Sequence, residues 1–353
     1  MASEQDPVLV TGGAGYIGSH VVWALADAGR PVVVLDDLSG GRREALPGSV
    51  PLVVGSIGDR RLVESLLVEH RISTVLHFAG SVLVGQSVAD PLGYYANNTV
   101  NSHALLSACV AVGVENFIFS STAAVYGMPA EQPIAESAAT QPINPYGASK
   151  LMTEMMLRDT AAAHGLHYVV LRYFNVAGAD QAGRTGERRP VATHLINVAT
   201  QAALGRRPSI DIFGADYDTP DGTCIRDYIH VSDLADAHVK AVEHLERGGA
   251  SLTANCGYGR GVSVREVLDQ VETVAGRKLA IRLAPRRPGD PPRLVAAADL
   301  VRSALGWQHP PRRSRLHHPD RARLGAASGR GRSGRRVACG AAAGCSGATC
   351  WPG

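Results

Sequence analysis

Two short segments near the middle of the chain contain residues that could transfer a proton. Tyr146 and Lys150 stand four positions apart in the segment NPYGASK, so on a helix both would lie on the same face. A free tyrosine titrates at about pH 10, but a neighbouring ammonium group lowers the pKa of the phenol. Tyr146 could then accept a proton from a hydroxyl group, and Thr122 in the segment SSTAAVYG could relay it.

The Tyr-x-x-x-Lys spacing is also common by chance, and most copies are surface residues on a helix. Its interpretation therefore depends on the elements around it. Ser121 and Thr122 follow a β-branched run, which would place them at the carboxyl edge of a sheet, where ligands bind in α/β folds. Ser121, Thr122, Tyr146 and Lys150, together with the glycine turn and the aspartate described next, favour an active site over a surface helix.

A glycine-rich turn predicts a dinucleotide site. Gly12, Gly15 and Gly18 directly follow the first apolar run and open the first helical segment. Glycine lets a turn adopt unusual dihedral angles and brings the backbone close to a pyrophosphate. The helix N-terminus offers free N–H groups and a positive dipole to that anion. Glycines also serve ordinary tight turns, but the position between strand and helix favours dinucleotide binding.

Asp36 indicates which dinucleotide would bind. It closes the second apolar run, where a carboxylate can accept hydrogen bonds from ribose hydroxyls and would repel a 2′-phosphate. The alternative role, a turn-forming aspartate, can be filled by Asp37. The sequence therefore predicts NAD rather than NADP. The positive nicotinamide ring would further favour the Tyr146 phenolate and could take a hydride from the carbon whose hydroxyl Tyr146 deprotonates.

These residues meet only if a parallel sheet aligns the ends of its strands. Over the first half of the chain, β-branched runs alternate with segments that carry apolar residues at helical spacing. This pattern predicts a doubly wound parallel sheet of the Rossmann type, covered on both faces by helices. The expected strands are residues 8–11, 31–36, 51–54, 74–78, 116–120 and 168–173, and the expected helices are 16–28, 59–69, 91–111 and 146–164.

The pattern becomes less regular after Asn175, which predicts a smaller α/β substrate domain interleaved with the first. Helices are expected at 194–205 and 264–275, a strand at 279–283, a loop at 178–190, and a polar, turn-rich segment at 209–222. A strand at 224–231, a helix at 232–246 and a strand at 250–256 are interpreted as a return to the first domain. The predicted division is a cofactor domain at 1–178 with 223–258, a substrate domain at 179–222 and 259–308, and a tail at 309–353.

The composition is that of an ordinary soluble enzyme, with 45% apolar and 19% charged residues among 353. The net charge of +3 combines +8 in residues 309–353 with −5 in the rest, so the body lacks the clustered cations that nucleic acid requires. No stretch approaches the roughly 20 apolar residues of a membrane helix, and no secretory signal pattern is found. The scattered cysteines favour a reducing, cytoplasmic location.

The last 45 or so residues differ in character from the rest. Arg, Gly, Ala and Ser dominate, and such a composition cannot bury enough apolar surface to order itself. We interpret this tail as a disordered appendage or as the product of a shifted reading frame. Cys339, Cys345 and Cys350 lie near His317 and His318, but their spacing matches no metal-ligand pattern, so no metal is expected.

Several motifs resemble a known family. TGGAGYIGSH, HFAG, SSTAAVYG, NPYGASK and LRYFNVAGA resemble the extended short-chain dehydrogenase/reductase family, in its NAD-dependent epimerase/dehydratase group. FGADYDTPDGTCIRDYIHVSDLADAH and RRPGD are more specific and narrow the resemblance, over about residues 7–307, to UDP-glucose 4-epimerases. The resemblance implies reversible inversion at carbon 4 of UDP-glucose and UDP-galactose through a transient 4-keto sugar. It also implies tightly bound NAD that is regenerated in each turnover.

The resemblance assigns roles residue by residue. Thr122, Tyr146 and Lys150 would be catalytic. The residues expected to bind NAD are Gly12, Gly15, Tyr16, Ile17, Gly18, Asp36, Ser56, Ile57, Phe78, Ala79, Gly80, Asn97, Ser120, Tyr146, Lys150 and Tyr173. The residues expected to bind the UDP-sugar are Thr122, Phe174, Asn175, His194, Leu195, Phe213, Arg226, Arg287, Asp290 and Leu294. The chemistry agrees, since two arginines suit a diphosphate and an aromatic ring can line a uracil pocket.

A few positions separate this chain from its relatives. Ala123 and Ala124 stand where sugar-nucleotide 4,6-dehydratases carry acid–base carboxylates, which elimination of water needs and epimerisation does not. Ser56, Val82 and His194 stand where relatives often have Asp, Lys and Asn. These three changes would alter the affinity for cofactor and substrate but would leave the reaction chemistry intact.

Two alternatives remain open: a different UDP-sugar as the substrate, and a protein without catalytic activity. Leu294 stands where some relatives have a bulky tyrosine, so N-acetylated UDP-hexoses are expected to be accepted too, and a pentose or a uronic acid is also possible. The other alternative is a non-catalytic NAD-sensing regulator, although such proteins typically lose the tyrosine or the lysine. Relatives pair the helices corresponding to 91–111 and 146–164, which implies a homodimer, and no nucleic-acid or membrane partner is expected.

Overall fold

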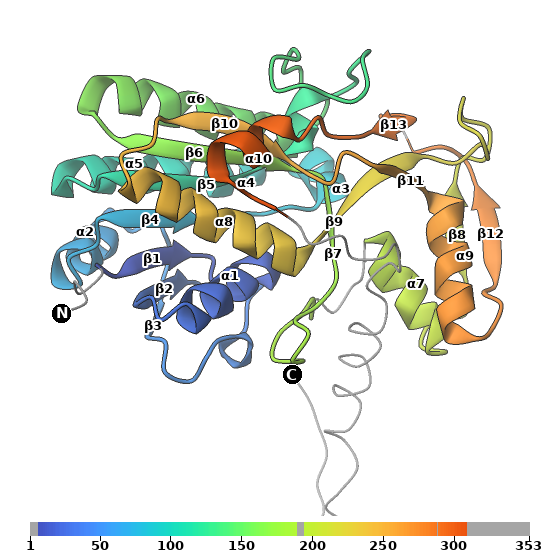
Figure 1. Ribbon diagram of the computed structural model, residues 1–353, viewed down its shortest axis with the longest axis horizontal. Helices are drawn as coiled ribbons and strands as arrows, with labels where there is room; N and C mark the ends of the chain where they lie inside the picture. The colour runs from blue at the N-terminus through green and yellow to red at the C-terminus, as the bar shows by residue number, and fades with distance from the viewer. Residues whose placement is uncertain (1–5, 189–193, 288, 309–353) are drawn as a thin grey trace, which may run out of the picture.

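The computed structural model describes residues 6–188, 194–287 and 289–308. The expectations for residues 309–353, including the tail and the histidines and cysteines in it, lie outside these ranges. A large twisted sheet with helices on both faces forms most of the molecule, and a smaller lobe adjoins one end of it (Figure 1).

The large sheet has seven strands in the order β10-β6-β5-β4-β1-β2-β3. All neighbouring strands are parallel, so their carboxyl ends lie along one edge. This confirms the doubly wound parallel sheet that the sequence predicts. The strands are β1 (Val8–Thr11), β2 (Val32–Asp36), β3 (Leu52–Val54), β4 (Thr74–His77), β5 (Asn116–Thr122), β6 (His167–Tyr173) and β10 (Leu252–Cys256).

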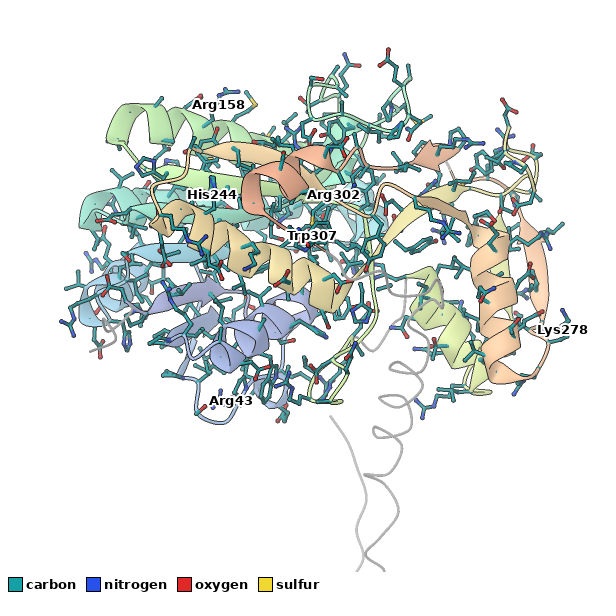
Figure 2. All side chains as sticks on the ribbon, viewed as in Figure 1. Arg43, Arg158, His244, Lys278, Arg302 and Trp307 are labelled. Atoms are coloured by element: carbon teal, nitrogen blue, oxygen red, sulfur yellow. The ribbon has the colours of Figure 1, made fainter. Side chains whose placement is uncertain are left out.

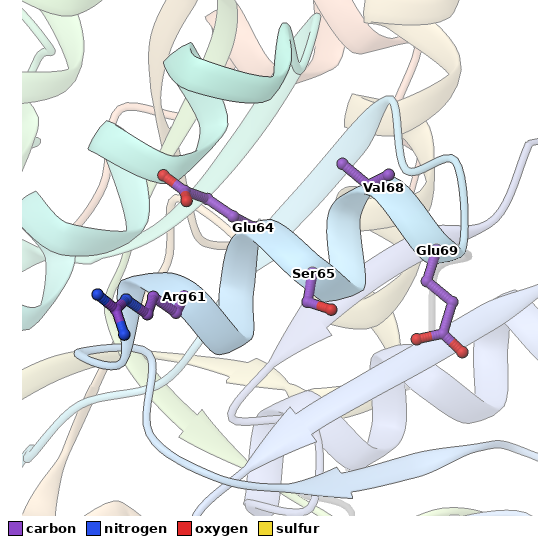
Figure 3. A pocket seen from close by; sticks show the side chains of 5 residues that line it. All are labelled: Arg61, Glu64, Ser65, Val68 and Glu69. Carbon is purple, nitrogen blue, oxygen red and sulfur yellow. The ribbon is translucent and has the colours of Figure 1, made fainter.

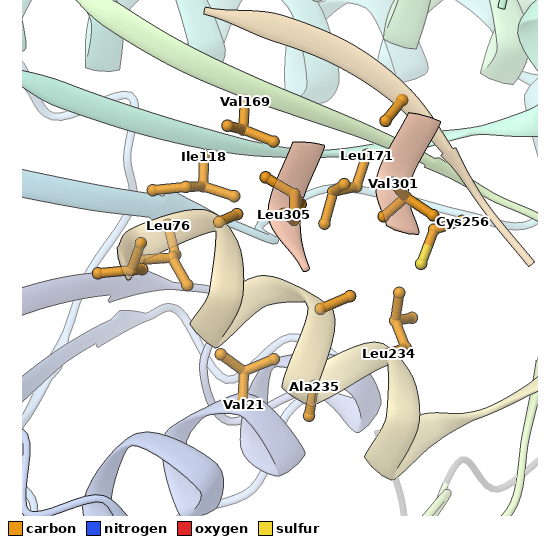
Figure 4. Close-up of a cluster of buried hydrophobic side chains, with 14 of the residues drawn as sticks. Val21, Leu76, Ile118, Val169, Leu171, Leu234, Ala235, Cys256, Val301 and Leu305 are labelled. Carbon is orange, nitrogen blue, oxygen red and sulfur yellow. The ribbon is translucent and has the colours of Figure 1, made fainter. Parts of the chain in front are cut away.

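Two buried clusters hold helices against the two faces of the sheet. Side chains alternate along β1, so Val8 and Val10 belong to one cluster and Leu9 to the other. The first cluster, part of which is drawn in Figure 4, joins the sheet to α1 (Tyr16–Asp27), α8 (Val231–Glu246) and α10 (Asp299–Leu305). The second joins it to α2 (Arg60–Glu69), α5 (Asn101–Val112) and α6 (Pro145–His164). Burial on both faces explains why the strands read as continuous apolar runs.

The helix expected at 91–111 is present but is built in three parts. α4 (Pro91–Tyr94) passes into a π-helical segment (Tyr95–Val100), which continues as α5. The short helix α3 (Val84–Ala89), which precedes them, was not predicted from the sequence. The π-helical segment packs against α6, and π turns within α-helices are frequent at functional sites.

The smaller lobe contains α7 (Leu195–Ala203), α9 (Val264–Ala275) and two short strands, β8 (Ile210–Phe213) and β12 (Ile281–Ala284), which pair in parallel. The expectation that 209–222 would be only polar turns was wrong at its start, because Ile210 and Ile212 alternate into the core of the lobe. The side chain of Ser263 caps α9, with a reciprocal hydrogen bond from the backbone N–H of Ser263 to Glu266.

A third, small sheet connects the lobe to the body. β9 (Ile225–His230) pairs with β7 (Asn175–Ala177), β11 (Gly261–Ser263) and β13 (Arg293–Leu294) rather than with the large sheet. Of the elements expected to return to the first domain, β10 therefore joins the large sheet, whereas β9 does not. The boundaries of the two predicted domains remain a prediction.

The end of the described chain packs on the body, not on the small lobe. α10 contacts α8 and β10, and Trp307, which follows it, is fully buried. The indole N–H of Trp307 donates to the carbonyl of Asp233 on α8 at 2.9 Å. Trp307, labelled in Figure 2, is thus part of the core of the body.

Candidate active site

The residues expected to hold NAD gather at the carboxyl edge of the large sheet. Gly12 follows β1, Asp36 ends β2, Phe78 follows β4, and Tyr173 ends β6. Adjacent strands are in register, for example Thr11 beside both Leu35 and His77, so these positions lie next to one another. Sheet topology alone therefore collects residues that are far apart in the sequence.

The glycine turn leaves room for a close approach and for no side chain. Gly12 has φ +70°, and a Cβ there would lie 2.4 Å from the backbone nitrogen of Ala79. A Cβ on Gly18 would lie 2.4 Å from the carbonyl oxygen of Gly12. Helix α1 begins after Gly15 without a side-chain cap, so its first N–H groups face the turn. This cradle fits the pyrophosphate of a dinucleotide.

Asp36 is buried and held by the backbone. Its carboxylate accepts hydrogen bonds from the backbone N–H of Ala14 at 2.9 Å and of Leu38 at 2.8 Å. Burial raises the pKa of Asp36, while the two hydrogen bonds counteract that rise. The bond to Ala14 places the carboxylate beside the glycine turn, where it can accept further hydrogen bonds from a ribose. The side chains therefore fit NAD.

The other expected cofactor residues surround this cradle. The Tyr16 hydroxyl donates to the carbonyl of Gly178 at 2.8 Å, while Ile17 packs against the first buried cluster. After β3, Ser56 is exposed and accepts from the N–H of Gly58 at 3.1 Å, whereas Ile57 is buried. The amide of Asn97, on the π-helical segment, donates to Ser81 at 2.9 Å.

Lys150 lies buried beneath the same edge. Its ammonium donates to the carbonyl of Ser120 at 3.0 Å and lies 4.9 Å from the centre of the Phe119 ring. Burial lowers the pKa of Lys150 to about 8, against the opposing charge of Glu154. Gly80 lies beside this ammonium with φ +151°, a backbone conformation that residues with side chains rarely adopt.

Tyr146 and Thr122 complete the catalytic group expected from the sequence. The side chain of Asn144 caps α6 through the N–H of Gly147 at 2.8 Å, which fixes the helix one residue from Tyr146. The Thr122 hydroxyl oxygen, at the end of β5, accepts from the N–H of Ala124 at 3.1 Å. This bond orients the hydroxyl so that its proton can be donated to another group.

Tyr173 links this group to the cofactor edge. Its hydroxyl is hydrogen-bonded to the Ser120 side chain, and Ser120 also holds Lys150 through its carbonyl. The pKa of Tyr173 is raised, first by burial and then by the nearby Tyr146.

The residues expected to hold the UDP group meet between the body and the small lobe. Arg226 on β9 forms an ion pair with Asp290 at 2.5 Å, and Leu294 is the register partner of Arg226. The guanidinium of Arg287 lies 3.9 Å from the centre of the Phe213 ring. Two cations, a carboxylate and an aromatic ring therefore lie on adjacent segments, as a nucleoside diphosphate site requires.

The remaining expected substrate residues occupy the segments between these two groups. Phe174 is buried directly after β6, and Asn175 is exposed at the start of β7. His194 immediately precedes α7, is 43% exposed, and lies 3.4 Å from a carboxylate oxygen of Glu187. Leu195 packs against the core of the small lobe. Asn175 lies closest to this group in topology, because β7 pairs in parallel with β9, the strand that carries Arg226.

Sequence reasoning missed a set of buried polar side chains below the active site. Arg172 and Glu154 form an ion pair at 2.6 Å, and both are almost fully buried. His77 is hydrogen-bonded to Thr11 at 2.8 Å and to Ser102 at 2.9 Å, and burial lowers its pKa to about 3. The available signal was a polar residue inside an apolar strand, as Arg172 and His77 are.

The pocket in Figure 3 does not compete with this site. It is lined by five residues of α2 alone, Arg61, Glu64, Ser65, Val68 and Glu69, none of which is an expected catalytic, cofactor or substrate residue. Within the described ranges, no group of three or more His, Cys, Asp or Glu side chains could hold a metal ion. None of the described helices has the length and apolar character needed to cross a bilayer.

Comparison with known proteins agrees with this geometry. The model of the NAD dependent epimerase/dehydratase family matches residues 8–257. The UDP-glucose 4-epimerase of Azospirillum brasilense is 67% identical over 300 residues, which cover 85% of this chain and 86% of the relative. The chain belongs to the UDP-glucose 4-epimerases of this family.

Solved UDP-glucose 4-epimerases share the fold. The enzyme from Brucella ovis, in complex with NAD, is 46% identical with a TM-score of 0.87, and the match covers 91% of this chain and 98% of that one. The UDP-Glc/GlcNAc 4-epimerase of Campylobacter jejuni is 41% identical with a TM-score of 0.79, over 91% and 99% of the chains. The predicted resemblance, the NAD cofactor and the isomerase class are thereby confirmed.

Proposed function

We propose that this chain interconverts UDP-glucose and UDP-galactose, with Thr122, Tyr146 and Lys150 as its catalytic residues. The observation that carries the proposal is the single carboxyl edge at which the glycine cradle, Asp36, Thr122 and the buried Lys150 meet. Of the nucleoside diphosphate residues, Arg226 lies on β9 of the small sheet that connects the body to the lobe, and Asp290, which precedes β13, forms an ion pair with it.

The residues of the chain would handle the proton. Lys150, with a pKa of about 8, is largely protonated at neutral pH, and its desolvated charge favours the phenolate of Tyr146. Tyr146 then accepts the proton of the sugar 4-hydroxyl, directly or through Thr122. NAD, held by the glycine cradle and Asp36, would supply the hydride chemistry at carbon 4 when bound. Arg226 and Arg287 hold the diphosphate while the transient 4-keto sugar rotates.

The segment after Thr122 favours epimerisation over dehydration within this family. Ala123 and Ala124 lie in the turn of helix that follows β5, directly beside Thr122. Dehydratases need a carboxylate pair at these positions, and two methyl groups cannot move protons. Since Tyr146 and Lys150 are both present and partly or fully buried, the site also differs from a regulator that has lost its catalytic groups.

The test is turnover without added cofactor. We expect purified protein to convert UDP-galactose to a mixture with UDP-glucose, followed by NMR, because regenerated NAD stays bound. If conversion appears only after NAD is added, cofactor binding is weak, and exposed Ser56 is then the first residue to examine. Silence with NAD present, beside turnover of a UDP-pentose or UDP-uronic acid, would favour another sugar. Silence toward every sugar would favour the regulator.

N-acetylated sugars are a second proposed substrate class. Leu294 lies beside Arg226 in the register of β13 and β9, so its side chain limits the volume next to the diphosphate site. We expect UDP-N-acetylgalactosamine to react as well, and Leu294→Tyr to reduce that activity at least tenfold while UDP-galactose still turns over. Parallel NMR assays check this. A wild-type enzyme that turns over only the plain sugar would contradict it.

We also propose that the enzyme is a cytoplasmic homodimer. An exposed apolar face is formed by Val88 of α3, Leu92 of α4, Val100 of the π-helical segment, and Met152 and Met155 of α6. These elements contact one another, which supports a shared apolar surface, and such surfaces mark protein interfaces. Among the described residues the cysteines are free and buried, which fits a reducing compartment.

The dimer proposal predicts the effect of a single charge. Leu92 is 78% exposed, so Leu92→Asp should leave the fold intact but place an unpaired charge in the interface, and the dimer should dissociate. Analytical ultracentrifugation checks this. Val68→Asp is the matched control, because Val68, labelled in Figure 3, is 63% exposed on α2, a helix that contributes no residue to this face. Equal masses for the two variants would count against the interface.

A further inference from the structure

A buried polar network connects residues that neighbour Thr122, Lys150 and Tyr173. Glu154 lies one helical turn beyond Lys150 on α6 and accepts a hydrogen bond from Ser121, which directly precedes Thr122. Arg172 donates to both carboxylate oxygens of Glu154, at 3.0 and 2.6 Å, and directly precedes Tyr173. Ser121 and Arg172 are register partners on β5 and β6.

The network continues away from the site, and its polar groups are hydrogen-bonded to one another. Arg172 donates to the Tyr126 hydroxyl at 3.0 Å, and Tyr126 donates to the side chain of Asn255 on β10 at 2.7 Å. Asn255 in turn donates to the carbonyl of Ile134 at 2.8 Å. A buried charge pair is expensive unless such bonds compensate it, and replacing it by apolar residues is often stabilising. Fold stability alone therefore does not account for its presence here.

Glu154 also supplies the negative charge that acts on Lys150. Two other titratable groups face Lys150 and are neutral: His77 on β4, because burial lowers its pKa, and Tyr173 on β6, because burial raises its pKa. The third is Tyr146, the proposed partner of Lys150, which lies on the same helix α6. Arg172 on β6 is directed at Glu154 rather than at the lysine.

We propose that Glu154 is a positioning residue, which keeps Lys150 protonated and fixes the end of β5 through Ser121. The inference rests on the roles proposed above for Lys150 and Tyr146. Burial and Glu154 act on the lysine in opposite directions, and the balance leaves its pKa at about 8. Loss of the carboxylate charge leaves burial unopposed, so Lys150 loses its proton at lower pH.

The chain is suited to a direct measurement because it contains only three lysines, Lys150, Lys240 and Lys278. Carbon-13 labelling of lysine gives three ε-carbon signals, and Lys150→Met identifies the one of interest. In the NAD-loaded enzyme we expect Glu154→Gln to lower the titration midpoint of Lys150 by about one pH unit or more. The Lys240 and Lys278 signals should stay in place. Glu154→Asp, which retains the charge, should restore most of the shift.

The pH at which kcat/KM falls on the alkaline side of its pH profile provides the second readout. In Glu154→Gln this fall should occur at lower pH, by the same amount as the Lys150 midpoint shifts. A merely structural role of Glu154 would not cause this change. If this variant does not fold, Glu154→Gln with Arg172→Met removes both buried charges and should show the same direction of change. An unchanged Lys150 midpoint in a folded variant overturns the inference. If the Lys150 midpoint shifts but the pH profile of kcat/KM does not, the inference about Glu154 is supported. That result would contradict the proposed role of Lys150 in turnover.

Discussion

Replacing Tyr146 with Phe should reduce turnover of UDP-galactose by a factor of about 10² to 10⁴, because the site loses its proton acceptor. The ring is buried at the start of α6, so the apolar part of the side chain keeps its contacts and the fold should not change. NAD should remain bound, since the glycine cradle and Asp36 are untouched. Turnover by NMR and the cofactor content of the purified variant check both parts.

Tyr168→Phe is the matched control for this prediction. Tyr168 lies at the opposite end of β6 from Tyr173, away from the carboxyl edge, so losing its hydroxyl should leave turnover within about twofold. Wild-type turnover by Tyr146→Phe would refute its role as proton acceptor. Loss of both activity and NAD would instead show that the phenol serves mainly to hold the cofactor.

Much of this site could be predicted because local sequence and global topology specify it together. The glycine turn had to follow β1 and open α1, and Asp36 had to end β2, so these two sequence features sufficed to indicate NAD. Tyr146 and Lys150 lie on one helix, where the four-residue spacing alone decides their common face. Parallel strands then bring such positions to one edge, whatever their separation along the chain.

The elements that were missed depend on contacts between distant segments. β8 is four residues long and is stabilised by pairing with β12, about 70 positions away, so its alternating pattern is visible only once that partner is known. β9 resembles a core strand in sequence, yet it pairs in the small sheet because β7, β11 and β13 surround it. Short strands have too few residues for a pattern to decide between two sheets.

The buried network was missed for a related reason. Glu154 and Arg172 are separated by 18 positions and lie on a helix and a strand, and nothing in either segment indicates that the two charges meet. Charged side chains usually lie at the surface, so the sequence alone gives no reason to expect either of these two side chains in the core. The structure instead uses them to connect Lys150, Thr122 and Tyr173 through their immediate neighbours.

The last described residues should be as important for stability as the catalytic group is for turnover. Trp307→Ala should lower the free energy of unfolding by about 3–5 kcal/mol, since it removes a fully buried indole and leaves the Asp233 carbonyl without its donor. Urea denaturation at fixed protein and NAD concentration measures it. Trp307→Phe keeps most of the volume and should cost less than half as much. Leu300→Ala is the control on α10, the helix that precedes Trp307, because Leu300 is 37% exposed. An equal loss there would mean that α10 is held by its surface rather than by Trp307.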